Sequence, residues 1–246
     1  MFWDWWQSLF TDMPAYAFFN FKFLPKYGYA VIQGVEYTLI LSVVSVLLAV
    51  LPALMLATMR LSKCAPVRWL SGAYIAAFRS TPMLVQLIII YYGVFNAILV
   101  PKFLIFGFID STRFIPGVVA LALNSSAYVA EIFRAGILAV DSGQMEAARS
   151  LGLSQSQSMR LVILPQAIKN ILPALGNELV VLIKETSVLG YIGVVDLARA
   201  GEQIRARTLD AFMPLLAVAL IYYVIVKLLS SLLSRLERRM REGDKR

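Results

Sequence analysis

Six charged side chains lie inside segments that are otherwise strongly apolar. They are Glu36, Arg79, Glu131, Glu178, Lys184 and Glu185. Charges at membrane depth are costly, so they usually face a cavity or a partner and mark the path of a polar solute. The 246 residues include no histidine, and the single cysteine is Cys64. This removes the usual general base, an internal disulfide and a cysteine metal cluster, so the charges indicate binding or transport rather than an intramembrane enzyme.

Two apolar segments place polar residues on one helix face. Asn124, Tyr128 and Glu131 are four and three residues apart, and Glu178 and Glu185 are seven apart. At 1.5 Å per residue, Asn124 lies roughly 12 Å from the outer end of its helix and Glu185 roughly 18 Å from the inner end of an antiparallel one. In a core about 30 Å thick these two depths coincide. The residues are expected either to line a binding site or to hold helices together, and the spacing alone leaves both open.

The longest polar interruption between apolar blocks is GQMEAARSLGLSQSQSMRLVILP, residues 143–165. Its Glu-Ala-Ala run, residues 146–148, favours a short helix with the acid in the first turn, near the positive end of the helix dipole. Gly152 should end this helix, because glycine tolerates the positive φ of a C-terminal cap. Ser154 and Gln157 have the spacing of a capping box. We therefore expect a helix, a sharp turn and a second helix outside the lipid.

The composition is that of a membrane protein. The chain is 59% hydrophobic and only 15% charged, whereas soluble domains are about 45–50% apolar. The N-terminal sequence MFWDWWQSLF lacks the basic start of a cleaved signal peptide, and its tryptophans suit a membrane interface. We expect one all-α transmembrane domain over residues 1–246.

About five spans are expected, with Pro82 in the first turns of the second, Pro116 opening the third and a polar loop over residues 196–210. The apolar blocks cover approximately residues 29–59, 74–100, 116–139, 173–193 and 214–233. Five spans put the termini on opposite sides. The basic residues behind the net charge of +8 gather near residues 60–68, around residues 143–165 and in the C-terminal tail. Because basic residues favour the cytoplasmic side, we expect the N-terminus outside and the C-terminus in the cytoplasm.

The polar loop resembles the EAA loop of ABC-importer permeases. The shared pattern is Glu-Ala-Ala, three residues, Gly, nine residues, a branched residue (here Val162), one residue and Leu-Pro. The resemblance implies a type I ABC importer permease fold and a loop that docks into a groove on an ATP-hydrolysing subunit. The implied coupling residues are Glu146, Ala147, Ala148, Gly152, Leu153, Leu164 and Pro165. From the residues alone, a plain cytosolic connector is the favoured interpretation of the loop. Glu146 is either a capping acid at the N-terminal end of its helix or a contact to the ATPase, and the two roles are compatible.

A second resemblance covers roughly residues 29–239. FRSTPMLVQ (78–86), NSSAYVAEI (124–132) and GNELVVLIKETS (176–187) are similar to segments of permeases in importers for histidine, arginine, glutamine, glutamate or cystine. The resemblance implies a substrate site made of Asn124, Ser125, Tyr128, Glu131, Lys184, Glu185, Ser187 and Arg79.

The resemblance implies that different residues bind the carboxylate and the ammonium group of an amino acid. The Asn124 amide would donate to its carboxylate, and Glu185 would pair with its ammonium or with a basic side chain. Arg79 has an alternative, which is to snorkel at the cytosolic edge. Ser80 stands where the family commonly has Gly, and Glu185 where it commonly has Asp, so the size of the pocket and the identity of the amino acid stay open.

No GxxxxGK[ST] motif occurs in the chain, so any nucleotide site belongs to another polypeptide and no cofactor is expected here. The expected partners are ABC ATPase subunits, a second permease, identical or homologous, an extracytoplasmic amino-acid-binding protein and membrane lipid, but no nucleic acid. Two rival interpretations remain. One is a proton-coupled secondary transporter that uses Glu131 and Glu185; the other is a non-transporting scaffold or sensor.

Overall fold

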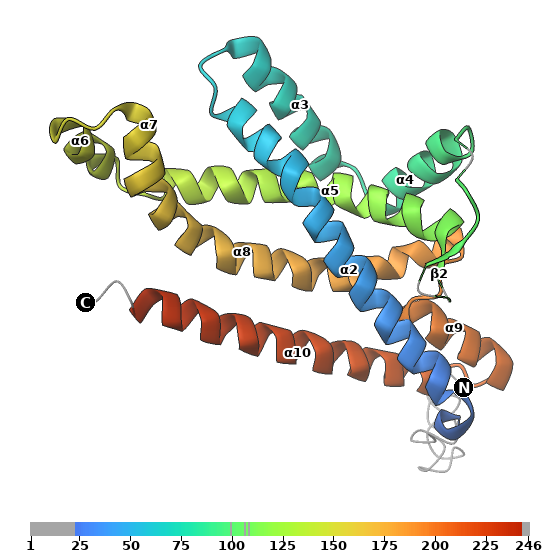
Figure 1. The fold of residues 1–246 in the computed structure, drawn as a ribbon. Coiled ribbons are helices and arrows are strands. Elements are labelled where there is room, and N and C mark those ends of the chain that lie inside the picture. Colours follow the sequence, from blue (N-terminus) through green and yellow to red (C-terminus); the bar gives the residue numbers. More distant parts are fainter. Residues whose placement is uncertain (1–22, 99, 106, 108, 243–246) are drawn as a thin grey trace, which may run out of the picture.

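The computed structural model describes residues 23–98, 100–105, 107 and 109–242, which form a bundle of helices (Figure 1). A short antiparallel pair, β1 (Leu104–Ile105) and β2 (Ile109–Asp110), lies before the third long helix. The helices in chain order are α2 (Leu24–Arg60), α3 (Ala65–Ser80), α4 (Met83–Ile88), η2 (Ile89–Phe95), α5 (Ser111–Leu138), α6 (Ser142–Ser150), α7 (Gln155–Ser158), η3 (Met159–Ile163), α8 (Leu164–Glu185), η4 (Thr186–Ile192), α9 (Leu197–Thr208) and α10 (Met213–Glu242).

Figure 1 shows α5, α8 and α10 running alongside one another, with α2 crossing them. Helices α6 and α7 lie at the same end of the bundle as the C-terminal end of α10. We call this the loop end. Helix α9 and the start of α2 lie at the opposite end. The expected location of the first tryptophans at an interface falls outside the described residues.

Three described helices are long and apolar enough to cross a membrane: α2, α5 and residues Met213–Met240 of α10. Helix α3 and the α4–η2 segment add a fourth span if the two halves, bent by 107°, count as one. Length and composition therefore account for three to four of the five expected spans. Helix α8 falls short because Lys169 and Glu178 interrupt its apolar sequence, yet it packs against both α5 and α10. Its polar residues consequently face neighbouring helices rather than lipid alone.

The segment expected to form one span over residues 74–100 is broken at Thr81 and Pro82. Thr81 is extended (φ −115°, ψ 143°), as a residue before proline tends to be, and Pro82 precedes α4 instead of lying in its first turns. Gln86 satisfies carbonyl groups that the break leaves free: its Nε2 donates to Phe78 O at 2.8 Å and to Thr81 O at 3.0 Å. Lipid offers no such partner, so a break at membrane depth depends on a side chain of this kind.

Two other helices begin earlier than expected. Helix α5 starts at Ser111 rather than Pro116, because the Asp110 carboxylate accepts a hydrogen bond from Thr112 N–H at 2.9 Å and caps the helix. Helix α8 starts at Leu164 rather than near residue 173, and Pro173 lies inside it. Because of the earlier start, the polar side chains of α8 lie farther from the loop end than a start near residue 173 implies.

The expected polar loop over residues 196–210 is mostly helix α9. Its N-cap, Asp196, is fully buried, accepting from Arg199 N–H at 3.0 Å and from the Tyr222 hydroxyl at 3.2 Å. Burial raises the pKa of the Asp196 carboxyl, and these hydrogen bonds act in the opposite direction. Thr38 completes the junction by accepting from Leu197 N–H at 3.1 Å, so α2, α9 and α10 are joined at the end opposite the loop.

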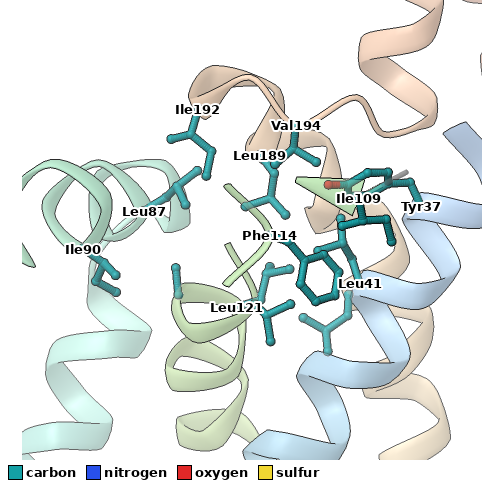
Figure 2. Packing of buried hydrophobic residues seen from close by; sticks show 13 residues of the cluster. Tyr37, Leu41, Leu87, Ile90, Ile109, Phe114, Leu121, Leu189, Ile192 and Val194 are labelled. Atoms are coloured by element: carbon teal, nitrogen blue, oxygen red, sulfur yellow. The ribbon is translucent and has the colours of Figure 1, made fainter. Parts of the chain in front are cut away.

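Three apolar clusters hold the bundle, and one of them joins the start of α2 to α9 and α10. In Figure 2, Leu41 of α2, Leu87 of α4, Leu121 of α5 and Leu189 of η4 meet in a core that holds α4 against its neighbours. The second cluster lies toward the loop end and is rich in alanine, drawn from α2, α5 and α8 (Ala53, Ala57, Ala127, Ala130 and Ala167). Small side chains let helices approach closely, which is the usual way that membrane helices pack.

Candidate functional site

The EAA-like loop, residues 143–165, has the helix–turn–helix form expected from its sequence. Asp141 caps α6 by accepting from Gly143 N–H at 2.8 Å. The expectation that Glu146 lies in the first turn is wrong, because the helix begins at Ser142 and the capping carboxylate is that of Asp141. The interpretation of Glu146 as the helix-capping acid therefore loses its support.

Gly152 makes the sharp turn after α6, with φ +87°. Leu153 N–H donates to Ala148 O and Gly152 N–H to Arg149 O, the hydrogen-bond pair of a Schellman motif. The capping box of α7 is present: Gln157 N–H donates to Ser154 Oγ, and Ser154 N–H donates to Gln157 Oε1. Every feature of this turn involves residues at most five positions apart.

The second loop helix does not end at Pro165. It continues through the π-helical turn η3 into α8 without a break. Proline has no N–H to donate and crowds the carbonyl group one turn earlier, and a π turn just before it accommodates both effects. The loop and the long helix α8 are thus one mechanical element, held to α6 by the Gln166 side chain, which donates to Gln144 Oε1 at 3.4 Å.

The surface of the loop combines charge with exposed apolar residues. Glu146, Ala147 and Gly152 are exposed, and Leu151 is 84% exposed, while Ala148 is buried against the chain. Among the other predicted coupling residues, Leu153 and Leu164 are half-buried and Pro165 is exposed. An exposed leucine at the tip of a polar loop is a feature that a partner surface would cover.

Inside the bundle, several hydrogen bonds join polar side chains from different helices, and two of them lie at the level of Asn124 and Ser125. Asn124 of α5 donates through Nδ2 to Gln86 Oε1 at 2.8 Å, and the Ser125 hydroxyl donates to Glu178 Oε1 of α8 at 2.7 Å. Asn124, Ser125, Gln86 and Glu178 are all buried. We call these four residues the central polar cluster; they connect α4, α5 and α8 at one level.

Glu185 does not lie at the level of Asn124, so the depth estimate is corrected. Taking the Ser125–Glu178 bond as a reference, Asn124 is one residue farther from the loop end, whereas Glu185 is seven residues, roughly 10 Å, farther. The estimate failed because it began α8 near residue 173 instead of Leu164. In the described part of the chain no hydrogen bond links Asn124 to Glu185.

The other predicted residues of α8 and η4 lie toward the end opposite the loop. Lys184 and Ser187 are exposed and Glu185 is half-buried. Ser187 lines an open pocket of about 430 Å³ together with Tyr191, Arg199 and Glu202, between η4 and α9. Within the described residues, no hydrogen bond joins Lys184, Glu185 or Ser187 to the central polar cluster.

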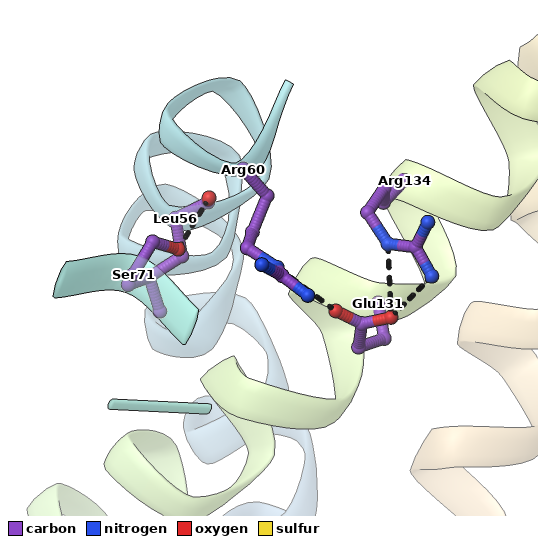
Figure 3. A network of polar contacts seen from close by, with 5 residues as sticks. All are labelled: Leu56, Arg60, Ser71, Glu131 and Arg134. Atoms are coloured by element: carbon purple, nitrogen blue, oxygen red, sulfur yellow. Dashed lines mark hydrogen bonds and ion pairs between the residues drawn. The ribbon is translucent and has the colours of Figure 1, made fainter. Parts of the chain in front are cut away.

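Arg79, Tyr128 and Glu131 lie on the loop side of the central polar cluster. The Arg79 guanidinium lies 5.4 Å from the centre of the Tyr128 ring. Glu131 Oε2 accepts two hydrogen bonds from Arg134, at 3.0 and 2.8 Å, and Oε1 lies 3.8 Å from Arg60 Nε (Figure 3). These residues line, or adjoin, a second open pocket of about 460 Å³ between α3, α5 and the end of α2.

The substrate site predicted from the sequence omits Gln86, Glu178 and Arg60, although each touches a predicted residue or lines its pocket. Glu178 shares a helix face with Glu185, and a correct start for α8 would have placed it beside Ser125. Gln86 has no periodic signal of its own, because its role follows from the break at Thr81 and Pro82. Arg60 is the last residue of α2 and resembles an ordinary cytosolic-edge arginine in the sequence.

A family model described as the binding-protein-dependent transport system inner membrane component matches residues 45–242. The chain belongs to this family. It is therefore a membrane permease component, and its apolar helices are those of an inner membrane protein.

Relatives of this permease are named as permeases of amino acid transport systems. It is 40% identical over 214 residues to the arginine transport system permease protein ArtQ of Bacillus subtilis (strain 168), covering 87% of this chain and 94% of that protein. It is 39% identical over 219 residues to a putative glutamine transport system permease protein GlnP of Rickettsia typhi, covering 89% of this chain and 96% of the other.

Solved structures agree with the fold. A crystal structure of an amino acid ABC transporter with histidines superimposes with a TM-score of 0.81 at 46% identity, covering 89% of this permease and 98% of that chain. The inward-facing MetNI methionine ABC transporter gives a TM-score of 0.72 at 20% identity, which supports the fold alone. The expected type I ABC importer permease fold is confirmed.

Proposed function

We propose that this chain is the permease subunit of an ATP-driven ABC importer that carries a polar amino acid across the cytoplasmic membrane. The observation that carries the proposal is the continuity of the EAA-like loop with α8, which joins an exposed docking surface to a helix of the central polar cluster. The names of the arginine and glutamine relatives support the substrate class. ATP and Mg²⁺ are held by a partner, and this chain contributes no cofactor site.

The loop docks on an ABC ATPase subunit. Glu146, Ala147 and Leu151 are exposed on α6 and its turn, where a groove on the partner would receive them. When the ATPases close on ATP, the loop moves with them, and α8 moves because no break separates the two. The unbroken junction therefore favours a loop that transmits motion over a plain connector between two spans.

The loop end faces the cytoplasm in this proposal, with the C-terminus, and the N-terminus lies outside. The α6–α7 loop and the C-terminal end of α10 share one end of the bundle (Figure 1), and both are basic, with Arg149 and Arg160 in the loop and Arg235 and Arg238 on α10. Basic residues at one end favour the cytoplasmic side. A second permease and an extracytoplasmic binding protein complete the importer.

The amino acid passes three levels of polar residues. Lys184, Glu185 and Ser187 meet it first from outside, then Asn124, Ser125 and Glu178, and finally Arg79, Tyr128 and Glu131. A zwitterion needs donors for its carboxylate and an acceptor for its ammonium group, and the central polar cluster supplies both in the Asn124 amide and the Glu178 carboxylate.

The docking surface is tested by co-purification. Leu151→Asp should abolish retention of the ATPase subunits, because a charge at the centre of an apolar contact is desolvated without a partner. Leu209→Asp is the matched control: Leu209 is 91% exposed at the opposite end and should leave the complex intact. Retention of the ATPases by the Leu151→Asp protein at the wild-type level would contradict docking through this loop.

A further inference from the structure

Helix α10 lies on the outside of the bundle, where it packs against α8 and α9 (Figure 1). Only 11% of the residues in its most apolar stretch are buried, compared with 67% in the corresponding stretch of α5. Most of the surface of α10 is therefore open to lipid or to another molecule. The chemical character of that surface changes along one face of the helix.

This face is apolar before Lys227 and polar after it. Leu220, Tyr223 and Val224 precede Lys227 by seven, four and three residues, so they share its face, and all three are exposed. Beyond Lys227 the face carries serines and arginines, which line an open pocket of about 440 Å³ on α10. We call the residues of this pocket the basic face of α10: Lys227, Ser230, Ser231, Ser234, Arg235 and Arg238.

The change from apolar to polar falls near the expected edge of the membrane. Helix α10 begins at Met213, so at 1.5 Å per residue Lys227 lies roughly 21 Å along the span and Arg235 roughly 33 Å. The hydrocarbon core is about 30 Å thick, which places Arg235 and Arg238 at the level of the lipid headgroups. Lys227 lies inside the core but close enough to its edge for the ammonium group to reach the same level.

The three cations of the basic face have no acid beside them. In the part of the chain that the structure describes, no ion pair joins a carboxylate to Lys227, Arg235 or Arg238. Glu237 points away from them, into the pocket between α5, α8 and α10 that Lys169 also lines. The basic face therefore carries three positive charges that a ligand can neutralise.

The serines leave acceptors between these cations. Ser231 Oγ donates to Lys227 O at 2.8 Å, and Ser234 Oγ donates to Ser230 O at 2.9 Å. Their hydrogens are thus used within the helix, while the lone pairs of their oxygens can still accept hydrogen bonds. Small side chains here also leave room for a headgroup to approach the helix.

We propose that the basic face of α10 binds one anionic phospholipid in the leaflet at the loop end. Its phosphate accepts hydrogen bonds from Arg235, Arg238 and Lys227, as basic pockets at membrane helices do with acidic headgroups. A headgroup hydroxyl, such as those of phosphatidylglycerol, donates to a serine oxygen. An acyl chain runs along Tyr223 and Val224. The site requires that α10 spans the membrane and is independent of what the permease transports.

Charge and position select this occupant over two others. A second copy of the chain, related by a two-fold axis through this face, would bring two sets of three positive charges together. A soluble anion such as free phosphate would use the cations but not the exposed apolar residues directly before Lys227. A phospholipid matches both halves of the face.

The test is lipid binding to the purified full-length protein, together with the subunits that co-purify with it, in an uncharged detergent. Native mass spectrometry counts the lipids bound during titration with dioleoylphosphatidylglycerol or dioleoylphosphatidylcholine. Wild type should bind one phosphatidylglycerol per copy of this permease at least about tenfold more tightly than phosphatidylcholine. Inorganic phosphate and glycerol 3-phosphate, added in excess, should not displace it.

Variants then locate the site. The double change Arg235→Gln with Arg238→Gln should weaken phosphatidylglycerol binding at least about tenfold and leave phosphatidylcholine binding unchanged, because each basic residue at a membrane surface contributes roughly fivefold. Arg235→Lys with Arg238→Lys keeps the charges and should retain most of the affinity. Lys63→Gln with Arg68→Gln is the matched control, since it removes two exposed charges from the region between α2 and α3.

Four results would overturn the proposal. Phosphatidylcholine binds as tightly as phosphatidylglycerol, the soluble phosphates displace the lipid, or the double glutamine variant and the Lys63–Arg68 control bind it equally well. The fourth is that the double glutamine variant loses a second permease copy rather than a lipid, which would make this face a contact between subunits. The comparison of the two lipids on wild type needs no variant, and none of these measurements depends on transport.

Discussion

The EAA-like loop and the central polar cluster differ in the distance along the chain from which their contacts come. In the loop, the Schellman turn at Gly152 and the capping box at Ser154 join residues at most five positions apart. In the cluster, Asn124 meets Gln86 across 38 residues, and Ser125 meets Glu178 across 53. Local contacts therefore shape the EAA-like loop, whereas the central polar cluster forms only once three helices, α4, α5 and α8, have packed.

Glu178→Ala tests the central polar cluster and should have the largest effect. It leaves the Ser125 hydroxyl without its acceptor and removes the carboxylate of the cluster, so ATP-driven uptake should fall at least about tenfold, the effect of losing one charge-assisted hydrogen bond. Arg205→Ala, which breaks a partly exposed ion pair with Glu202, is the control and should transport normally. Normal uptake by Glu178→Ala would remove the cluster from the path.

Gly152→Ala tests the loop side of the comparison. Alanine at φ +87° is strained by about 1–2 kcal/mol, so the turn opens and α6 changes direction. We expect ATP hydrolysis to continue while the number of amino acids imported per ATP falls severalfold. Gly107→Ala is a matched control, since Gly107 has φ +79° and, like Gly152, open space around its Cα. Equal coupling in the two variants would contradict the sharp turn as a coupling element.

Gln86→Leu tests whether the break between α3 and α4 depends on a distant side chain. It leaves the Asn124 amide and the carbonyl groups of Phe78 and Thr81 without their partner, and each unsatisfied buried group costs about 1–3 kcal/mol. Unfolding in detergent should show a loss of at least about 2 kcal/mol. Gln33→Leu, which removes one exposed hydrogen bond to Tyr29, should change stability little, and equal losses would disprove the role of Gln86.

The smallest expected effect belongs to Ser154→Ala. It removes one half of the capping box, which typically costs about 1 kcal/mol of helix stability. Hydrogen exchange of the α7 amides should rise while the bundle stays protected. Ser156→Ala, an exposed serine inside the same helix, is the control. An unchanged exchange rate in Ser154→Ala would show that packing against α6, not the cap, holds α7.

The features that these variants test differ in how well the sequence predicted them. The loop was predicted almost completely, because capping and glycine rules act over single turns. The first-turn position of Glu146 was wrong, since Asp141 begins the helix earlier, and the direct continuation of the second loop helix into α8 was not predicted. The membrane class and the approximate number of spans followed from apolar composition, but α8 shows its limit, as polar residues packed against neighbours hide a helix from a composition test.

The levels inside the bundle were less predictable. Placing the start of α8 near residue 173 shifted Glu185 to the depth that Glu178 occupies beside Ser125. Pro82 was placed inside a span, although Thr81 and Pro82 end one helix and a second begins beyond them. These errors concern helix boundaries. The prolines at positions 82, 116 and 173 suggested boundaries that the Gln86 side chain, the Asp110 cap and the π turn before Leu164 override.

The central claim is that an ATPase drives this bundle through the loop that continues into α8. The most direct measurement is amino acid uptake into proteoliposomes containing the complete transporter, with and without lumenal ATP, for wild type and for Leu151→Asp. The account predicts uptake that requires ATP in wild type and is absent in the variant. Uptake that continues without ATP and follows an imposed proton gradient would contradict it.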